Sequence, residues 1–270
     1  MSGYVFVRKL GEGEYGQVVE VINQRDQKKY AAKQIPLNLF SEQLFQRLQL
    51  LNHPNIVKVF QYEICNNSAY YLMELLHEQS LYKYIRNHQL ELEAIQFYSA
   101  QIILALDYLH KNDVIYRDLK SENLLLMKNG YLKLVDFDLS KLVKYPQKTN
   151  TLCGSPGFMA PEAIQGQGYN NSVDYWSLGV LLYEFSTGEL PFKGKTPYEV
   201  YQAIVNDKVE FPQCIDKSVK LLIKQLLTKN AQKRMKKVKN FEQILTDSEV
   251  YSSLNLNDLY NQKLLAPYYP

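Results

Sequence analysis

The chain has 270 residues, of which 46% are hydrophobic and 22% charged, and its formal net charge is +3. This balance excludes an intrinsically disordered, collagen-like or coiled-coil protein, and so small a net charge gives no reason to expect nucleic acid as a partner. The sequence has no apolar stretch of membrane-spanning length and no leader-like start, so we expect no membrane insertion and a cytoplasmic location, with the nucleus as a second location.

The first 76 residues are rich in β-branched and aromatic runs separated by turn-forming residues. These runs predict strands over residues 4–7, 18–21, 30–35, 56–62 and 70–73. Between them, Leu44, Leu48 and Leu51 recur at spacings of four and three, which predicts one amphipathic helix over residues 39–51.

After about residue 76 the pattern becomes helical. Residues 95–109 carry an apolar stripe with a period near 3.6. Residues 173–185 are apolar almost all round, as in a buried helix, and Gly188 is expected to end it. Strands followed by helices predict an α+β protein of two lobes. We interpret the basic run 233–239 as a solvated helix face, and Cys65, Cys153 and Cys214 as free thiols.

A Gly-x-Gly-x-x-Gly motif stands at Gly11, Gly13 and Gly16. A dinucleotide-binding turn would open a helix at the third glycine, whereas here Val18 continues a strand, so the glycines are predicted to lie in a hairpin. Glycine lets backbone N–H groups approach phosphate closely, although a plain hairpin has the same spelling.

Lys33 stands in the middle of an apolar strand, where a charge is costly unless it is paired. Two interpretations remain open for it. It is either an ordinary edge-strand lysine or a lysine that reaches the phosphates of a nucleotide.

The most informative stretch is Tyr-Arg-Asp-Leu-Lys-Ser-Glu-Asn at residues 116–123. Asp118 is suited to accept a hydroxyl proton, and Asn123 to ligate a hard cation through its amide oxygen. Asp136 follows thirteen residues later, at the end of a predicted strand. Oxygen donors from two separate segments suit Mg²⁺, although each piece alone would also fit a solvated turn.

The order of these motifs resembles the signature set of eukaryotic protein kinases, completed by Ala-Pro-Glu at residues 160–162. The stretch TLCGSPGFMAPE at 151–162 and the tyrosine before Arg117 are similar to the AGC group, in particular to its cyclic-nucleotide-dependent kinases. The sequence NQKLLAPYYP at 261–270 is similar to the start of their C-terminal tail. The resemblance implies a bilobal kinase domain over residues 1–250, with lobes of about 1–76 and 77–250, and a tail segment over 251–270.

The resemblance also implies roles for individual residues, with ATP and magnesium as cofactors. Asp118 would accept the proton of the substrate hydroxyl, and Lys120 would neutralise the γ-phosphate. Asn123 and Asp136 would hold magnesium, and Lys33 would hold the α- and β-phosphates. The adenine site would be formed by Leu10, Val18, Ala31, Leu125, the gatekeeper Met73 and the hinge residues from Glu74 to Leu76. Lys120 and Ser155 favour serine and threonine over tyrosine as acceptors.

Regulation and substrate choice follow from the same resemblance. Thr151 stands at the activating phosphorylation site of AGC kinases, with Arg117 as the expected partner of its phosphate and Lys141 as a second cation. Glu122 and Glu184 match the acidic positions that bind a substrate arginine. The expected partners are therefore basic protein or peptide substrates, together with either a regulatory subunit or an upstream kinase. Two further acidic positions of the family are Ser80 and Gly157 here, so we expect a relaxed preference.

Two departures from the family pattern bear on activity. The helix position that should carry the glutamate partner of Lys33 is Leu44, and Glu42 lies about 200° away around the helix. Asp138 replaces the glycine of Asp-Phe-Gly; its backbone N–H still allows a hydrogen bond to Asp136, but aspartate restricts the backbone.

A serine/threonine kinase is the predicted function, and a pseudokinase that binds nucleotide without transfer is the main alternative. The intact set Asp118, Lys120, Asn123 and Asp136 favours the kinase. A dinucleotide-dependent oxidoreductase rests on the glycine motif alone. The resemblance also implies a structural ion pair between Glu162 and Arg234, and Asp174 and Trp176 would begin the buried helix.

Overall fold

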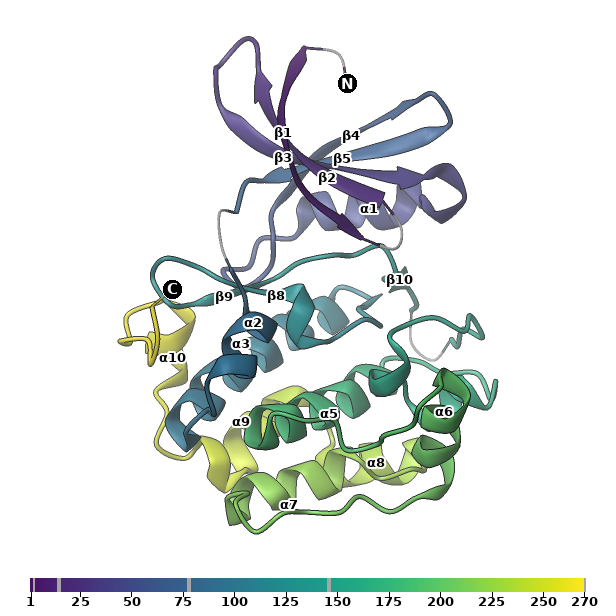
Figure 1. Ribbon diagram of the computed structural model, residues 1–270, viewed down its shortest axis with the longest axis vertical. Helices are drawn as coiled ribbons and strands as arrows, with labels where there is room; N and C mark the ends of the chain where they lie inside the picture. Colours follow the sequence, from purple (N-terminus) through teal and green to yellow (C-terminus); the bar gives the residue numbers. More distant parts are fainter. Residues whose placement is uncertain (2, 14–15, 77–78, 145–146, 270) are drawn as a thin grey trace. The chain divides into compact units, whose positions relative to one another are not determined.

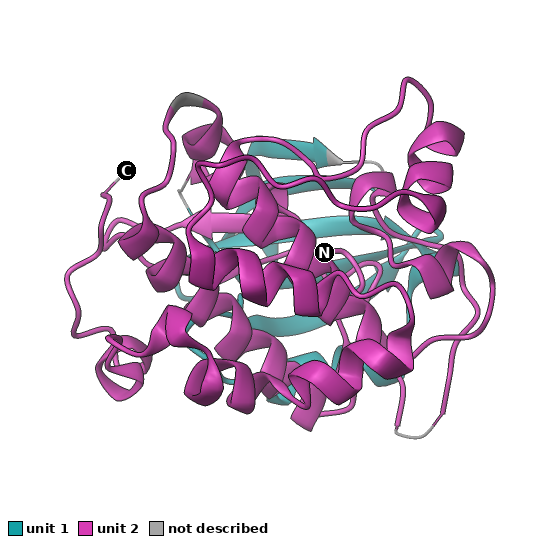
Figure 2. Cartoon of the chain, turned by 90° about the horizontal axis from the view of Figure 1, so that it is seen from below, with its two compact units in different colours: residues 1–77 teal, residues 78–270 magenta. Residues whose placement is uncertain are grey.

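In the computed structural model (Figure 1), all residues are described except 2, 14–15, 77–78, 145–146 and 270. The tip of the predicted glycine hairpin and the last residue of the tail-like stretch therefore lie outside the described residues. The chain divides into two compact units, residues 1–77 and 78–270, coloured separately in Figure 2.

Unit 1 is built on one antiparallel sheet of five strands in the order β1-β2-β3-β5-β4. The strands are β1 (Tyr4–Gly13), β2 (Gly16–Asn23), β3 (Lys29–Pro36), β4 (Val59–Cys65) and β5 (Ser68–Glu74). Val21, Ala32 and Leu72 pack together on one face of the sheet. Tyr71 is next to Leu72 in β5 and so points to the other face, where its ring and that of Tyr62 contact Phe45 of helix α1 (Glu42–Leu50). The helix therefore covers one face of the sheet, as Figure 1 shows.

Two predicted boundaries in unit 1 were wrong. Helix α1 begins at Glu42 rather than at residue 39, because the Ser41 side chain caps it by accepting a hydrogen bond from the N–H of Leu44 at 3.3 Å. Residues Leu37–Leu39 form a separate 3₁₀ turn, η1. Strand β4 begins at Val59 rather than at residue 56, because the N–H of Ile56 closes a turn on the carbonyl of His53.

Unit 2 is mostly helical. Its longer helices are α2 (Leu81–Asn87), α3 (Leu92–Lys111), α5 (Ser172–Thr187), α6 (Pro197–Asn206), α7 (Lys217–Leu226), α8 (Ala231–Val238) and α9 (Phe241–Asp247). Short helical segments are η2 (Ser121–Asn123), η3 (Pro156–Phe158), α4 (Pro161–Ile164), η4 (Glu249–Tyr251) and α10 (Leu256–Tyr260). Short strands pair as β6 (Gln79–Ser80), β8 (Leu124–Leu126) and β9 (Leu132–Leu134), and as β7 (Val114–Ile115) with β10 (Lys141–Leu142).

Helix α5 is the centre of unit 2. Its residues from Ser172 to Ser186 are all buried, as the apolar pattern predicted. Gly188 ends it in the left-handed conformation (φ 74°), and its N–H bonds the carbonyl of Glu184 at 2.7 Å. The predicted helical stripe 95–109 lies within α3. In the described residues no helix has the length and apolar character of a membrane span, and all three cysteines are free.

Candidate active site

The segment 116–123 lies in unit 2 between the short strand β7 and strand β8. Its backbone is held by hydrogen bonds to Asp174, a fully buried carboxylate in the first turn of α5. The N–H groups of Tyr116 and Arg117 donate to the two oxygens of Asp174 at 3.0 and 2.8 Å. Arg117 has a positive φ of 70°, and this pair of bonds holds it there.

The Asp118 carboxylate is buried, at 7% exposure. Its Oδ2 accepts from the Asn123 side-chain amide at 2.8 Å and lies 2.8 Å from the ammonium of Lys120. Its Oδ1 accepts from the hydroxyl of Ser155 at 3.0 Å, and Lys120 donates to the same hydroxyl at 2.8 Å. A carboxylate, an ammonium and a hydroxyl thus meet in one small network.

Asn123 and Asp136 are brought close through the backbone, since the carbonyl of Asn123 accepts from the N–H of Val135 at 3.0 Å. The side-chain N–H of Asn123 donates to Asp118, so the amide oxygen is left for another partner. Asp136 has a positive φ of 63°, and its Oδ1 accepts from the N–H of Asp138 at 3.3 Å. The local hydrogen bond expected of Asp138 therefore forms without glycine.

Thr151 is exposed, and its surroundings connect it to Arg117 through a tyrosine. The Tyr169 hydroxyl donates to the carbonyl of Thr151 at 2.6 Å and accepts from the Arg117 guanidinium at 3.2 Å. Lys141 donates to the hydroxyl of Thr149 at 2.8 Å, which lies 3.3 Å from the Thr151 hydroxyl. Both predicted cations therefore belong to the network around Thr151.

Glu122 is exposed, whereas Glu184 on α5 is only 2% exposed. Burial raises the pKa of Glu184 to about 7. A hydrogen bond from Ser121 partly offsets this rise. The charge of Glu122 raises the pKa further, and the charge of Arg86 lowers it. Glu184 lines a cavity of about 410 Å³ together with Arg86 and His88 of the neighbouring segment. Within the described part of the chain its Oε2 is buried and has no hydrogen-bond partner.

The predicted nucleotide residues of unit 1 fall on one face of its sheet. Lys33 pairs with Val18 across the β2–β3 ladder, and Ala31 pairs with Met73 across the β3–β5 ladder. Residues directly opposite each other share a face, as do residues two apart in one strand, so these four side chains gather together. Gly11 pairs with Val18, and Gly13 with Gly16, which confirms the hairpin expected of the glycines.

Four further residues were predicted to contact the nucleotide, three in unit 1 and one in unit 2. Leu10 and Leu76 are half-buried, and the carboxylate of Glu74 accepts from the N–H of Lys58 at 2.7 Å. Leu125 belongs to unit 2, on β8, where it pairs with Ser80 and Lys133.

Helix α1 places Leu44 in the core at 5% exposure, with Leu48 and Leu51 beside it. Glu42 is exposed, and its carboxylate accepts from the Tyr62 hydroxyl at 2.5 Å and from the Gln46 amide at 3.4 Å. The helix register predicted from the leucines is therefore the one observed.

The predicted ion pair between Glu162 and Arg234 is present and buried. Ser172 donates to Glu162 at 2.9 Å, and Arg234 donates to the carbonyl of Thr228 at 2.9 Å. This pair ties α4 to α8, and its role is structural.

Sequence reasoning did not assign Tyr169 a role, and it treated Ser155 only as a marker of acceptor type. Each lies tens of residues from its partners, and no local pattern relates Tyr169 to Arg117 or Ser155 to Asp118.

The chain is similar to known protein kinases over most of its length. Residues 4–248 match the family described as protein kinase domain. The chain is 34% identical to cAMP-dependent protein kinase catalytic subunit 3 of Drosophila melanogaster over 100% of this chain and 48% of that protein. It is 34% identical to cAMP-dependent protein kinase catalytic subunit PRKX of Mus musculus over 98% of this chain and 76% of that protein.

A third relative is cAMP-dependent protein kinase type 3 of Saccharomyces cerevisiae, at 32% identity over 99% of this chain and 68% of that protein. The chain spans about half the length of several curated relatives that it matches, which are 48–55% covered. The sheet of unit 1, the helices of unit 2 and these matches lead to one conclusion. The chain belongs to the protein kinase family, in the AGC group that contains the cAMP-dependent kinases.

Proposed function

We propose that this chain is a serine/threonine protein kinase that transfers the γ-phosphate of ATP to hydroxyl groups of protein substrates. The observation that carries the proposal is the network of Asp118, Lys120 and Ser155. In the transfer, a bond forms between the substrate hydroxyl oxygen and the γ-phosphorus, and the bond from that phosphorus to ADP breaks. Asp118 takes the hydroxyl proton, and Lys120 offsets the charge on the transferred group.

We assign the magnesium ligands to Asn123 and Asp136. Their donor atoms are an amide oxygen and a carboxylate, which suit a hard cation that shares its shell with phosphates. The orientation of the Asn123 amide supports the assignment because its nitrogen is engaged by Asp118. Magnesium would neutralise charge on the phosphates, and the protein residues hold and orient it.

Nucleotide contacts are assigned by the resemblance to residues of both units. In unit 1, Lys33 would contact the phosphates, and the three glycines would let backbone N–H groups approach them. Val18, Ala31 and Met73 would contact the adenine. The common face of Val18, Ala31, Lys33 and Met73 supports this assignment. Leu10, Glu74, Leu76 and Leu125 complete the proposed set.

We propose further that substrates carry arginine near the acceptor, bound by Glu122 and Glu184. A buried carboxylate oxygen of Glu184 without a partner in the described structure supports a cationic ligand there. Phosphorylation of Thr151 by an upstream kinase would add nearly two negative charges beside Arg117 and Lys141, and so order this segment. A regulatory subunit is proposed on the printed names of the relatives alone.

Transfer of labelled γ-phosphate to an arginine-containing serine peptide tests the proposal, with Asp118→Asn as the matched inactive control. We expect transfer by the wild-type protein after Thr151 is phosphorylated, and loss of at least about a hundredfold in the variant. If the two proteins are equally silent while ATP still binds, the pseudokinase alternative is correct. Leu44 in place of the usual glutamate is the observation that favours that alternative.

A further inference from the structure

The positive charge of the chain is concentrated in its last helices. Residues 217–251 hold nine of the 31 Lys and Arg residues but three of the 28 Asp and Glu residues. This segment therefore carries +6, and the rest of the chain carries −3, although the total is +3. Between residues 217 and 239 there is no acidic residue at all.

Helix α8 presents part of this charge on one face. Lys233, Lys236 and Lys237 are exposed, whereas Arg234 and Val238 on the opposite face are buried. Lys237 donates to the Thr228 hydroxyl at 3.1 Å, and none of the three lysines forms an ion pair within the described residues. Lysines three and four residues apart repel each other, which an anionic ligand would relieve. We call these three residues the α8 lysine face.

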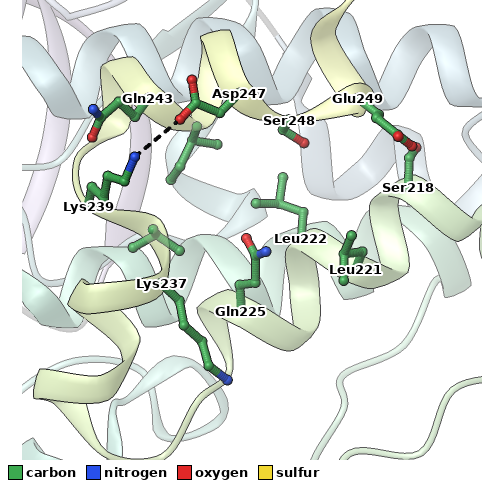
Figure 3. Close-up of a pocket in the computed structure, with 12 residues that line it drawn as sticks. Ser218, Leu221, Leu222, Gln225, Lys237, Lys239, Gln243, Asp247, Ser248 and Glu249 are labelled. Carbon is green, nitrogen blue, oxygen red and sulfur yellow. Dashed lines mark ion pairs between the residues drawn. The ribbon is translucent and has the colours of Figure 1, made fainter.

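A cavity of about 220 Å³ adjoins this face, between α7, α8 and the α9–η4 segment. Its apolar lining is Leu221, Leu222, Val238 and Ile244, and Leu221 is 57% exposed. In Figure 3, Leu222 and Gln225 extend from α7 toward the helix that carries Gln243 and Asp247. Engineered cavities of about 150 Å³ accept a benzene molecule, so this cavity has room for a large apolar side chain.

The charges at the cavity distinguish between two kinds of anionic ligand. Lys237 and Lys239 line it on one side, but Asp247 and Glu249 line it on the other, and Lys239 lies 3.6 Å from Asp247. A flat anionic membrane would approach both acidic residues and be repelled by them. A peptide can place its carboxylates on the lysines alone and its apolar side chain in the cavity.

We propose that the α8 lysine face and the adjoining cavity form a docking surface for an acidic segment of a partner protein. The partner segment has carboxylates that contact Lys233, Lys236 and Lys237, and one large apolar residue that enters the cavity beside Leu221. Charge complementarity steers the encounter, and the apolar residue supplies the anchor. The basic run thus has a role beyond that of the solvated face expected from the sequence.

Selection of short random peptides displayed on phage, with the full chain as the target, tests the proposal. We expect enriched peptides to combine several Asp or Glu residues with one Leu, Phe or Trp. Fluorescence polarisation then gives the dissociation constant of an enriched peptide for each variant. K233E/K236E and L221D should each weaken binding about tenfold, as should replacement of the apolar peptide residue by serine.

The matched control is K195E/K208E, which makes the same charge change at two exposed lysines outside the surface. It should alter the dissociation constant by less than about twofold, apart from a small long-range effect that salt removes. Circular dichroism and thermal unfolding establish that each variant is folded. The proposal is overturned if no acidic peptide is enriched, or if K233E/K236E binds the peptide as tightly as the wild type. It is overturned equally if the chain sediments with phosphatidylserine vesicles while enriched peptides fail to compete.

Discussion

The carboxylate of Asp118 divides its two oxygens between different partners. Oδ2 faces Asn123 and Lys120, whereas Oδ1 faces the N–H and the hydroxyl of Ser155. The Ser155 hydroxyl also accepts from the ammonium of Lys120, so it links Lys120 to the carboxylate of Asp118. This arrangement fixes the rotamer of Asp118 and keeps the lysine at a set distance, which is what proton transfer and charge neutralisation both require.

Removal of the Ser155 hydroxyl should therefore slow phosphate transfer more than it weakens nucleotide binding. For Ser155→Ala we expect kcat to fall about tenfold or more, the effect of losing hydrogen bonds to charged groups, with KM for ATP nearly unchanged. Ser155→Thr retains the hydroxyl and serves as the control. Steady-state kinetics on both variants measure kcat and KM separately. Equal kcat values for Ser155→Ala and Ser155→Thr would show that the hydroxyl has no part in the transfer.

Glu184 gives the proposed peptide recognition a pH dependence. Burial raises the pKa of this carboxyl to about 7, so the group is neutral in mildly acidic solution and charged above neutrality. Only the charged form attracts a guanidinium strongly. KM for a peptide with arginine near the acceptor should therefore fall several-fold from pH 6 to pH 8.

Two comparisons isolate Glu184 in that measurement. A peptide with alanine in place of the arginine should show no such fall, and Glu184→Gln should abolish it for the arginine peptide. The same pKa predicts a stability effect: because the unfolded carboxyl titrates near 4.5, stability falls from about pH 4.5 to pH 7 and is then constant. In Glu184→Gln the midpoint of thermal unfolding should therefore depend less on pH over that range. An unchanged pH dependence would contradict the raised pKa of Glu184.

Among the structural elements, the β1–β2 hairpin shows how a glycine motif can serve packing as well as function. A Cβ atom on Gly16 would lie 1.8 Å from the carbonyl oxygen of Gln34 on strand β3. A Cβ atom on Gly11 would meet nothing within 4 Å. The third glycine is therefore required by the sheet itself, independently of any phosphate.

Gly16→Ala should destabilise unit 1, whereas Gly11→Ala should not. The overpacked side chain forces β2 away from β3, at a cost of about 1–3 kcal/mol. Urea denaturation of both variants measures the difference in the free energy of unfolding. Equal stability of the two variants would mean that the hairpin adjusts without displacing β3.

The elements differ in how far the sequence predicted them. The buried helix α5 and its end at Gly188 follow from local composition, and so does the register of α1 from its leucines. The starts of α1 and β4 were misplaced because single hydrogen bonds of Ser41 and Ile56 decide them, and hydrophobic patterns do not detect such bonds. The contacts of Ser155 and Tyr169 depend on tertiary folding across long stretches of chain. The wall of the Glu184 cavity, with Arg86 and His88, escaped prediction for the same reason.

At the scale of the whole chain, charge is unevenly distributed along the sequence. Acidic groups gather at the proposed metal and peptide sites, and cations gather near Thr151 and on α7 and α8. Arg234 lies within the basic segment but is fully buried, so it belongs to the packing of unit 2 and not to its surface. Its contact with Glu162 joins positions 72 residues apart.

This buried pair should dominate the stability of unit 2 when one partner alone is removed. Arg234→Met leaves the Glu162 carboxylate buried beside Ser172, and Glu162→Gln leaves the guanidinium buried without its counter-charge. Each change should cost about 3–5 kcal/mol in the free energy of unfolding, because an unpaired charge remains in the interior. The double variant Glu162→Leu with Arg234→Met leaves no charge behind, so it should cost clearly less than the two single changes together. Urea denaturation at pH 7 measures all three values. If the single changes each cost under about 1 kcal/mol and simply add, water reaches the pair and the two helices are held by their apolar contacts instead.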